Sequence, residues 1–379
     1  MKTRSILSIL TALILILFAG TASVSAAVSD LPVAAGGILS SVELFTERDL
    51  EQQPDTTGAR SIVVRDNDEI RITDEGIYVL SGTASGAVIY IEADKEAKVQ
   101  LVLDSLSISN ETFPCIYILS ADKVFLTTAS DSFLSVNGSF ISDGDTNTDG
   151  VIFSKDDLVL NGTGTLTISS TDNGIVCKDD LKVTGGTYVI NAASKCMEAN
   201  DSIRIAAGSF VLTAGTDGLH AENDDDDSLG YIYICGGEFS IEAGDDAIHA
   251  ESVLQIDNGT ISISGAEGFE STYIQINGGT IDIQSWDDGV NAANKSYSYR
   301  TTFEMNAGEL SVSMGSGDTD GIDSNGDLYI NGGTIYVNAA SPFDCDGTAQ
   351  YNGGTVIVNG EQVDYLPLQS AGGSRGGRW

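Results

Sequence analysis

Short runs of alternating apolar and polar residues recur through the second half of the chain. Five of them share a strand, a Gly-rich turn and a second strand, and read DLVLNGTGTLTIS, DLKVTGGTYVINA, YIYICGGEFSIEA, YIQINGGTIDIQS and DLYINGGTIYVNA. Alternation of this kind is typical of strands that turn one side toward an interior. Helical periodicity is absent from these segments, so the pattern predicts an all-β protein.

The same unit returns in register along the chain. Its copies have a period of roughly 21 to 32 residues and begin at Val151, Ile175, Met197, Leu219, Ile248, Phe269, Val290 and Ile322. Two or three short strands cannot bury their own apolar side, but coils stacked about 4.8 Å apart form a continuous core. We therefore predict a parallel β-helix, a single-stranded solenoid, over residues 67–360. A propeller or an antiparallel sandwich fits less well, because neither needs the same residue type at the same place in every turn.

The segments on either side of the repeats have different characters. Residues 27–66 contain VELFTERDLEQQ, the only helix-like stretch, and we expect this segment to be an N-terminal cap over the open apolar end of the solenoid. Residues 361–379 read as an extended, Gly-rich C-terminal tail.

Residues 1–26 have the layout of a cleavable signal peptide. Lys2 and Arg4 precede an apolar run from Ile6 to Phe18, and small residues lead up to Ala27. This run is too short for a stop-transfer helix, and no later window approaches the ~20 apolar residues that a membrane span needs. We expect a secreted protein, either extracellular or associated with the cell surface.

The charge of the chain is strongly acidic, with 18 Lys and Arg against 55 Asp and Glu and a formal net charge of −37. Because Lys2 and Arg4 lie in the signal peptide, the mature chain has a charge of 16 − 55 = −39. Such a charge repels phosphate backbones and attracts divalent cations, so we do not expect nucleic acid as a partner. Taken by itself, the charge is explained by solubility more readily than by metal binding. The five cysteines are an odd number with irregular spacing, and we expect small core residues rather than a disulfide framework.

Acidic residues recur at the turn between successive coils. The repeat alignment gives one column at Asp217, Asp246, Glu267, Asp288 and Asp320, and a second column, three residues on, at His220, His249, Glu270, Asn291 and Asp323. Carboxylates about 4.8 Å apart repel one another, whereas a calcium ion between two coils would contact oxygens on both at about 2.3–2.6 Å. The columns therefore predict calcium sites. The alternative is that these side chains cap their own turns through backbone hydrogen bonds.

A second calcium candidate lies in the loop DTNTDG. Asp145, Asn147 and Asp149 have the spacing of the first ligands of a calcium loop, with Asp156 at the twelfth position, although no flanking helices make it an EF-hand. The acidic run from Asp224 to Asp227 reads instead as a solvated loop.

Two histidines and three aromatic residues are candidates for contacting sugar. His220 and His249, the only histidines, fall on neighbouring coils and could contact sugar hydroxyls or join Asp217 and Asp246 in a transition-metal site. Flat side chains on which sugar rings could stack come from Trp286, Tyr297 and Tyr299. The alternative is that the two histidines are only partly exposed turn residues and that the aromatic side chains only cover a loop.

Several longer motifs occur in a recognisable order along the chain, and they include ITDEGIYVLSG, KVQLVLDSLSISN, IFSKDDLVLNGTGTLTI, DGLHAEND and DGIDSNGDLYINGGTIYV. Over roughly residues 40–360 they resemble the motifs of the carbohydrate-binding-domain family of secreted β-helix proteins from cellulose-degrading bacteria. The resemblance implies a right-handed parallel β-helix with bound calcium and affinity for cellulose and acidic, pectin-like polysaccharide. KCMEAND departs from the family pattern, which has a KDD-type turn at that place.

These observations favour a non-catalytic carbohydrate-binding protein that uses calcium. A calcium-dependent, pectate-lyase-like enzyme is the first alternative, but it needs a base beside the acidic columns, and the nearby Lys195, Lys295 and Arg300 do not recur in register with them. A structural surface protein or adhesin, stiffened by calcium, is the second alternative.

Overall fold

The computed structural model describes residues 31, 36–40, 42–315 and 320–368. Within these residues the chain is all-β, with 34 strands and no helix. The predicted signal peptide of residues 1–26 lies outside the described residues. The described residues contain no helix that is long and apolar enough to span a membrane.

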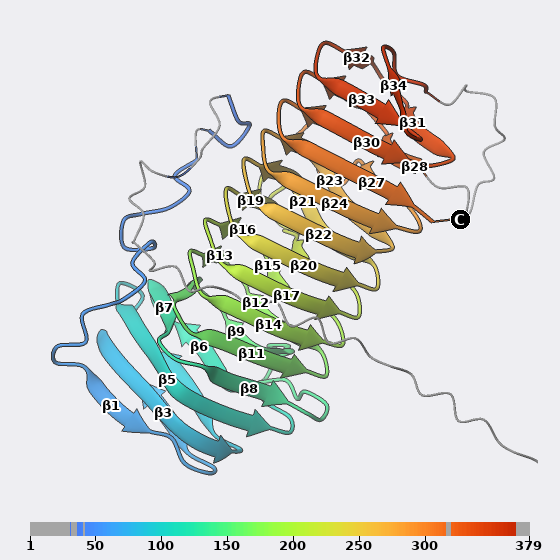
Figure 1. Ribbon diagram of the computed structural model, residues 1–379. Helices are drawn as coiled ribbons and strands as arrows, with labels where there is room; N and C mark the ends of the chain where they lie inside the picture. Colours follow the sequence, from blue (N-terminus) through green and yellow to red (C-terminus); the bar gives the residue numbers. More distant parts are fainter. Residues whose placement is uncertain (1–30, 32–35, 41, 316–319, 369–379) are drawn as a thin grey trace, which may run out of the picture.

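The strands of successive turns of the chain lie side by side and form three stacks (Figure 1). The first stack contains β1 (Arg60–Val63), β3 (Gly76–Ser85), β5 (Lys98–Asn110), β7 (Lys123–Thr128), β10 (Asp157–Gly162), β13 (Asp180–Val183), β16 (Ser202–Ile205), β19 (Tyr231–Ile234), β21 (Asp246–Ile256), β23 (Glu267–Ile276), β26 (Thr302–Met305), β29 (Asp327–Ile330) and β32 (Ala349–Tyr351). The second contains β8 (Ser132–Val136), β11 (Thr165–Ser170), β14 (Thr187–Ala192), β17 (Ser209–Ala214), β20 (Glu238–Ala243), β22 (Thr260–Gly265), β24 (Thr280–Ser285), β27 (Glu309–Met314), β30 (Thr334–Asn338), β33 (Thr355–Val358) and β34 (Glu361–Val363). The third contains β2 (Glu69–Ile72), β4 (Val88–Glu92), β6 (Ile116–Ser120), β9 (Gly150–Ser154), β12 (Asn173–Cys177), β15 (Met197–Ala199), β18 (Leu219–Ala221), β25 (Val290–Ala292), β28 (Asp320–Ser324) and β31 (Ser341–Cys345).

Parallel pairing between coils builds each stack. β10 pairs with β7 of the coil before and with β13 of the coil after, while β11 pairs in the same way with β8 and β14. The long strands β3 and β5 continue from the first stack into the second, and β21 and β23 continue from the third stack into the first. The described chain is therefore a stack of coils in one mostly parallel sheet system, in agreement with the predicted all-β class.

Alternation within each strand places one row of side chains inside the coils. In β17, Phe210 and Leu212 are buried while Val211 and Thr213 point outward, and the interior rows of all three stacks merge into one apolar core. Aromatic rings stack along this core: the Tyr188 and Phe210 ring centroids are 5.4 Å apart, and those of Phe210 and Phe239 are 4.5 Å apart. Equivalent residues of successive coils thus bury one another, as the repeat pattern predicts.

The Asn-Gly-Gly turns between the first and second stacks depend on glycine. Gly279 and Gly333 have φ angles of +88° and +80°, in the left-handed region that L side chains rarely adopt. A Cβ on Gly279 would also lie 2.9 Å from the carbonyl oxygen of Gly259 on the preceding coil. Close stacking of the turns therefore explains why the Gly-Gly pair recurs.

The N-terminal segment lies along the side of the molecule. We call residues 36–40 and 42–53 the strap; they contain turns where the sequence predicts a helix, so that prediction is wrong. Four apolar side chains of the strap pack on the outer side of the first stack, against Tyr231, Tyr233 and Val253 among others, and these strap residues are Leu39, Leu44, Phe45 and Leu50. The strap therefore crosses the coils lengthwise rather than forming the expected cap over an open end (Figure 1).

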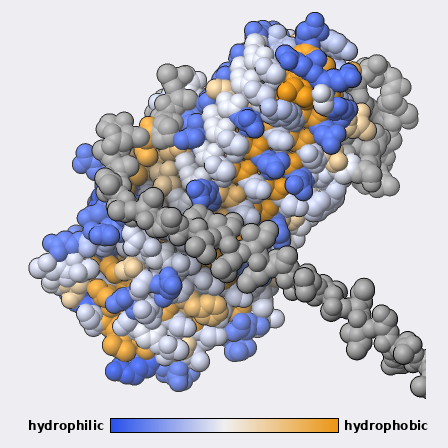
Figure 2. Space-filling view, in the orientation of Figure 1, coloured by the Kyte–Doolittle hydropathy of each residue, from blue (hydrophilic) through white to orange (hydrophobic). Residues whose placement is uncertain are grey.

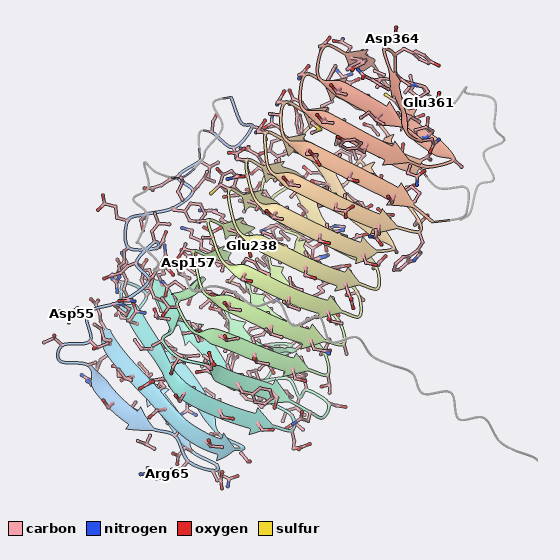
Figure 3. All side chains as sticks on the ribbon, viewed as in Figure 1. Asp55, Arg65, Asp157, Glu238, Glu361 and Asp364 are labelled. Atoms are coloured by element: carbon pink, nitrogen blue, oxygen red, sulfur yellow. The ribbon has the colours of Figure 1, made fainter. Side chains whose placement is uncertain are left out.

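A buried charge holds the strap to the first stack. Asp49 is fully buried, and its carboxylate lies 3.3 Å from Lys182 Nζ and 3.6 Å from Lys123 Nζ. Lys123 also lies 3.4 Å from Asp157, which is labelled in Figure 3. Side-chain amides extend the contact along the stack, because Leu39 N–H donates to Gln255 Oε1 at 2.8 Å and Ile38 N–H donates to Gln275 Oε1 at 2.9 Å.

The C-terminal segment is partly structured. β34 pairs antiparallel with β33, and Leu368 forms a bridge with Phe343 of the last coil. This pairing covers the outer edge of β33, which would otherwise present unpaired backbone groups. The extended tail predicted for residues 361–379 therefore begins with an ordered strand, and residues 369–379 lie outside the described residues.

The outer side of the second stack is mixed in polarity, and the cysteines are not cross-linked. The outward side chains of the second stack are mostly small and polar, and Figure 2 shows hydrophilic and hydrophobic residues interspersed on this side. All five cysteines are free, and Cys115, Cys177, Cys196 and Cys235 are buried. Cys115, Cys177 and Cys196 confirm the prediction of small core residues, whereas Cys235 is buried in the apolar cluster under the strap.

Candidate functional site

The acidic columns lie on the outer side of the third stack. In β18 the side chains of Leu219 and Ala221 point into the core, and His220 between them points outward. The equivalent strand segments of β21, β23, β25 and β28 repeat this alternation. Each of these coils therefore presents one polar side chain from the strand and one from the turn that precedes it.

The structure brings the strand residues together as one column, which we call the strand ladder. His220 pairs in register with His249, His249 with Glu270, Glu270 with Asn291, and Asn291 with Asp323. Glu198, which the repeat alignment also places at this position, pairs with His220 at one end, and Asp344, which the alignment missed, pairs with Asp323 at the other. Asp344 was missed because it follows Pro342 and Phe343 rather than the Gly-led turn of its neighbours.

The turn residues form a second column, the turn ladder, beside the first. Asp246 pairs in register with Glu267, and its N–H donates to Asp217 Oδ1 at 3.3 Å. The N–H of Asp320 likewise donates to Asp288 Oδ1 at 3.0 Å, one coil apart. All five predicted turn residues therefore lie along one edge. These two bonds join each aspartate to the backbone of the next coil rather than capping its own turn, and the second oxygen of Asp217 lies 2.8 Å from His220 Nδ1.

Cations compensate the acids in the half of the ladders that contains the histidines. His249 Nδ1 lies 2.8 Å from Asp246 Oδ2 and 2.9 Å from Glu270 Oε2, while Lys295 Nζ lies 2.9 Å from Glu270 Oε1. Burial works to lower the pKa of His249, but the two carboxylates raise it to about 10. Burial likewise works to raise the pKa of Glu270, and His249 and Lys295 lower it to about 2. This network is charged and internally balanced.

Acids crowd together in the other half of the ladders. Burial and the neighbouring Asp246, Glu270 and Asp288 raise the pKa of Glu267 to about 8. Burial and the charges of Asp288 and Asp320 raise the pKa of Asp323 to about 7, and burial and Asp320 raise the pKa of Asp288 to about 6. Like-charge repulsion of this kind favours protonation or a bound cation. The oxygen-only donor set of Glu267, Asp288, Asn291, Asp320 and Asp323 fits a hard cation such as calcium.

The calcium loop predicted at Asp145, Asn147 and Asp149 does not assemble with its twelfth residue. Asn147 Nδ2 donates to Asp149 Oδ2 at 2.7 Å, but Asp145 is exposed. Asp156 instead lies 2.5 Å from Lys95 Nζ and accepts a hydrogen bond from Ala121 N–H at 3.0 Å. The physical reason is that β9 carries the chain across the third stack between Asp149 and Asp156, so the two ends of the motif are separated.

A polar cleft of about 440 Å³ opens at the Glu198 end of the strand ladder. Lys178 Nζ and Lys195 Nζ lie 2.9 and 3.3 Å from the Glu198 carboxylate inside it. His220 and the acidic insertion at Asp224–Asp226 complete the walls. The insertion, predicted to be only a solvated loop, thus shapes a cleft. The position of the insertion could have indicated the cleft, because it interrupts the repeat directly after a ladder residue.

The predicted sugar-contacting residues do not form one surface. His220 is 7% exposed, with Nε2 3.1 Å from Glu222 Oε2, whereas Trp286 is 55% exposed and borders a shallow hollow with Gln284 and Met314. Tyr297 is 83% exposed, but Tyr299 packs against the apolar cluster under the strap. Trp286, two residues before Asp288, is the aromatic side chain best placed beside the ladders.

The fold and this site define a class: an all-β repeat protein whose coils stack polar and acidic side chains into ladders. The chain belongs to the family described as carbohydrate-binding domain-containing protein, whose sequence model matches residues 66–272 and 266–364. A carbohydrate-binding domain-containing protein of Acetivibrio thermocellus is 36% identical over 129 residues, which is 33% of this chain and 45% of that relative. The match therefore spans less than half of the relative's length.

One solved structure has a similar fold. It is described as the polysaccharide lyase-like protein from C. thermocellum, in a gadolinium derivative, and is 30% identical with a TM-score of 0.51. The likeness covers 59% of this chain and 94% of that one.

Proposed function

We propose that this chain is a secreted, right-handed parallel β-helix that binds polysaccharide without cleaving it, with calcium held between its coils. The glycan class is cellulose or an acidic, pectin-like polymer. Membership of a carbohydrate-binding family supports the binding role, and the leader-like pattern of residues 1–26 supports export. Neighbouring coils that pair in parallel support the β-helix, which in nearly all such crossovers is right-handed.

The crowding of Glu267, Asp288 and Asp323 is the observation that carries the calcium proposal. Coils about 4.8 Å apart leave room for an ion that contacts oxygens of both at about 2.3–2.6 Å. A calcium ion there would lower the repulsion between the acids and keep unfilled coordination positions on its outer side. Uronate carboxylates or sugar hydroxyls can occupy those positions, which links metal binding to glycan binding.

The basic residues near the ladders support binding over lyase chemistry. A lyase needs a base that is free to remove a proton from the sugar. Lys195 pairs with Glu198, Lys295 pairs with Glu270 at 2.9 Å, and Arg300 Nε lies 2.5 Å from Asp327. The likeness to a polysaccharide lyase-like structure nevertheless makes lyase activity the second candidate.

A pull-down on insoluble polysaccharide tests the proposal. We expect the wild-type protein to sediment with an acidic, pectin-like polymer in calcium and to stay in the supernatant with a chelator. The double variant Asp288→Asn, Asp323→Asn should lose the calcium-dependent part of binding, because amides bind calcium more weakly than carboxylates. Asp282→Asn, an exposed substitution on the second stack, is the matched control and should bind like the wild type.

Two outcomes would overturn this reading. Sedimentation that is equal in the double variant and the wild type would remove the ladders from the binding site. Unsaturated product that absorbs ultraviolet light, and that disappears in Arg300→Ala, would replace non-catalytic binding with lyase activity.

Calcium should stabilise the protein more at pH 8 than at pH 5. The pKa values of Glu267, Asp323 and Asp288 are raised to about 8, 7 and 6, so the calcium-free folded state binds more protons than the unfolded chain. Stability without calcium is therefore lost as the pH rises from about 4.5 toward 8, while calcium displaces those protons. Thermal unfolding with calcium and with chelator at both pH values measures the difference, and an equal gain at the two pH values would contradict the expectation.

A further inference from the structure

The only two histidines of the chain occur in a repeated motif, Asp-x-x-His-x-Glu. The first copy runs from Asp217 to Glu222 and the second from Asp246 to Glu251. Strand pairing places His220 directly beside His249, and their rings stack with centroids 4.6 Å apart and planes 20° from parallel. In both copies Nδ1 lies 2.8 Å from a carboxylate oxygen of the aspartate three residues earlier. The fold therefore aims two imidazoles at two acids on adjacent coils.

A third ligand completes the set at His249 alone. Glu270, on the next coil, brings Oε2 to 2.9 Å from His249 Nδ1, so that Nδ1 lies between two carboxylate oxygens. The ligand atoms of Asp246, His249 and Glu270 all lie within 4.8 Å of one another. The three side chains are only 9%, 12% and 11% exposed, so their positions are fixed by packing on the third stack.

The spacing of these atoms fits a small tetrahedral ion. Zinc binds nitrogen and carboxylate oxygen at about 2.0–2.2 Å, which separates ligands of a tetrahedron by about 3.3 Å. The observed nitrogen–oxygen separations of 2.8 and 2.9 Å would open by about half an ångström, within the reach of side-chain rotation. The ion would take the place of the proton on Nδ1, and a water or a ligand atom would fill the fourth position.

The surroundings of Glu270 suit a metal ligand. Lys295 Nζ holds Oε1 at 2.9 Å and leaves Oε2 toward His249, so the two oxygens have separate roles. Outer partners of this kind orient metal-binding carboxylates. An imidazole nitrogen also separates this set from the oxygen-only half of the ladders, because zinc and related transition metals accept imidazole whereas calcium takes six to eight oxygens.

We propose that Asp246, His249 and Glu270 form a transition-metal site, of which zinc is the representative ion, distinct from the calcium stretch at Glu267, Asp288 and Asp323. The strand ladder and the turn ladder together then have two halves with different metal chemistry. The site does not depend on glycan binding, so it stands or falls separately from the proposed function.

Titration calorimetry of the full-length protein with zinc chloride, in excess calcium, tests the site. We expect one zinc ion to bind with its affinity unaffected by calcium. His249→Gln and Glu270→Gln should each weaken binding by more than about 100-fold, beyond the 10–100-fold typical of losing an outer-shell partner. His220→Gln is the matched control, since it removes the stacked histidine of the neighbouring coil, and should stay within a few-fold of the wild type.

Cobalt substitution gives a second readout that does not depend on affinity. Cobalt at this site should give the visible absorption of a tetrahedral ion with nitrogen and oxygen ligands, and the bands should vanish in His249→Gln while the thermal unfolding curve shows that the variant is folded. An absence of zinc binding at micromolar concentrations, competition by calcium, or unchanged affinity in both Gln variants would show that these residues form only a histidine–carboxylate ion network.

Discussion

Replacement of Asp49 by asparagine is expected to lower the free energy of unfolding by about 3–5 kcal/mol, the usual cost of removing one partner from a buried ion pair. Asp49 is fully buried, and its loss leaves Lys182, which is 5% exposed, without its acid. Burial opposes ionisation of Asp49, yet the N–H of Thr46 and the two lysines hold the pKa of this carboxyl below its ordinary value. Urea denaturation followed by tryptophan fluorescence and circular dichroism measures the change.

The loop that follows the strap supplies a matched control. Asp55, labelled in Figure 3, is exposed on the loop that leads to β1, and Asp55→Asn should change the free energy of unfolding by less than about 0.5 kcal/mol. A second comparison replaces the whole pair: Asp49→Leu with Lys182→Met should recover most of the stability, because apolar side chains carry no desolvation cost. Equal stability of Asp49→Asn and the wild type would mean that the strap contributes little to the fold.

Acid should weaken the strap in the same way as the Asp49 substitution. A carboxyl whose pKa is lowered in the folded state stabilises the protein above its unfolded value, and this contribution disappears as the pH falls through the folded value. For Asp49 that window lies below its ordinary pKa of 3.8. The strap and the calcium stretch therefore respond in opposite directions to pH, because one acid is compensated by lysines and the others are crowded by acids.

The register of the ladders could be predicted from the sequence because strands cannot slip freely. A shift by one residue would turn Leu219 and Ile248 outward and put His220 and His249 into the core. The apolar alternation therefore fixes which residues of successive coils are neighbours, and the observed pairs follow the alignment from Ile175 onward. The predicted start of the first copy at Val151 is one residue early, because Ile152 is the residue that pairs with Ile175. The same alternation predicts the all-β class.

The path of the strap could not be predicted in this way. Its partners are set by complementary side chains far along the chain, such as Leu39 and Gln255, which are 216 residues apart. Sequence periodicity does not predict such a contact. The amphipathic pattern of VELFTERDLEQQ is compatible with a helix as well as with a series of turns. The pairing of ladder acids with cations could not be predicted either, because Lys295 contacts Glu270 from an insertion that is outside the repeat.

Phe210→Ala is the second substitution with a large expected effect, about 3–5 kcal/mol of unfolding free energy. Phe210 is 1% exposed and lies between two rings, at 5.4 Å from Tyr188 and 4.5 Å from Phe239. Alanine would leave a cavity in the core and remove both ring contacts, which add about 0.5–1.5 kcal/mol to simple burial. Urea denaturation measures the total loss.

The position of the ring inside a solenoid also predicts where the damage appears. Each coil contacts only its neighbours, so stability is lost mainly in the coils that contain β14, β17 and β20. Hydrogen exchange should therefore accelerate in those strands and stay nearly unchanged in β30 and β33 near the C-terminal end. Phe133→Ala is the control, because Phe133 is 39% exposed on β8 of the same stack and should cost less than about 1 kcal/mol. A uniform rise in exchange along the whole chain would instead show that the strap couples all the coils into one cooperative unit.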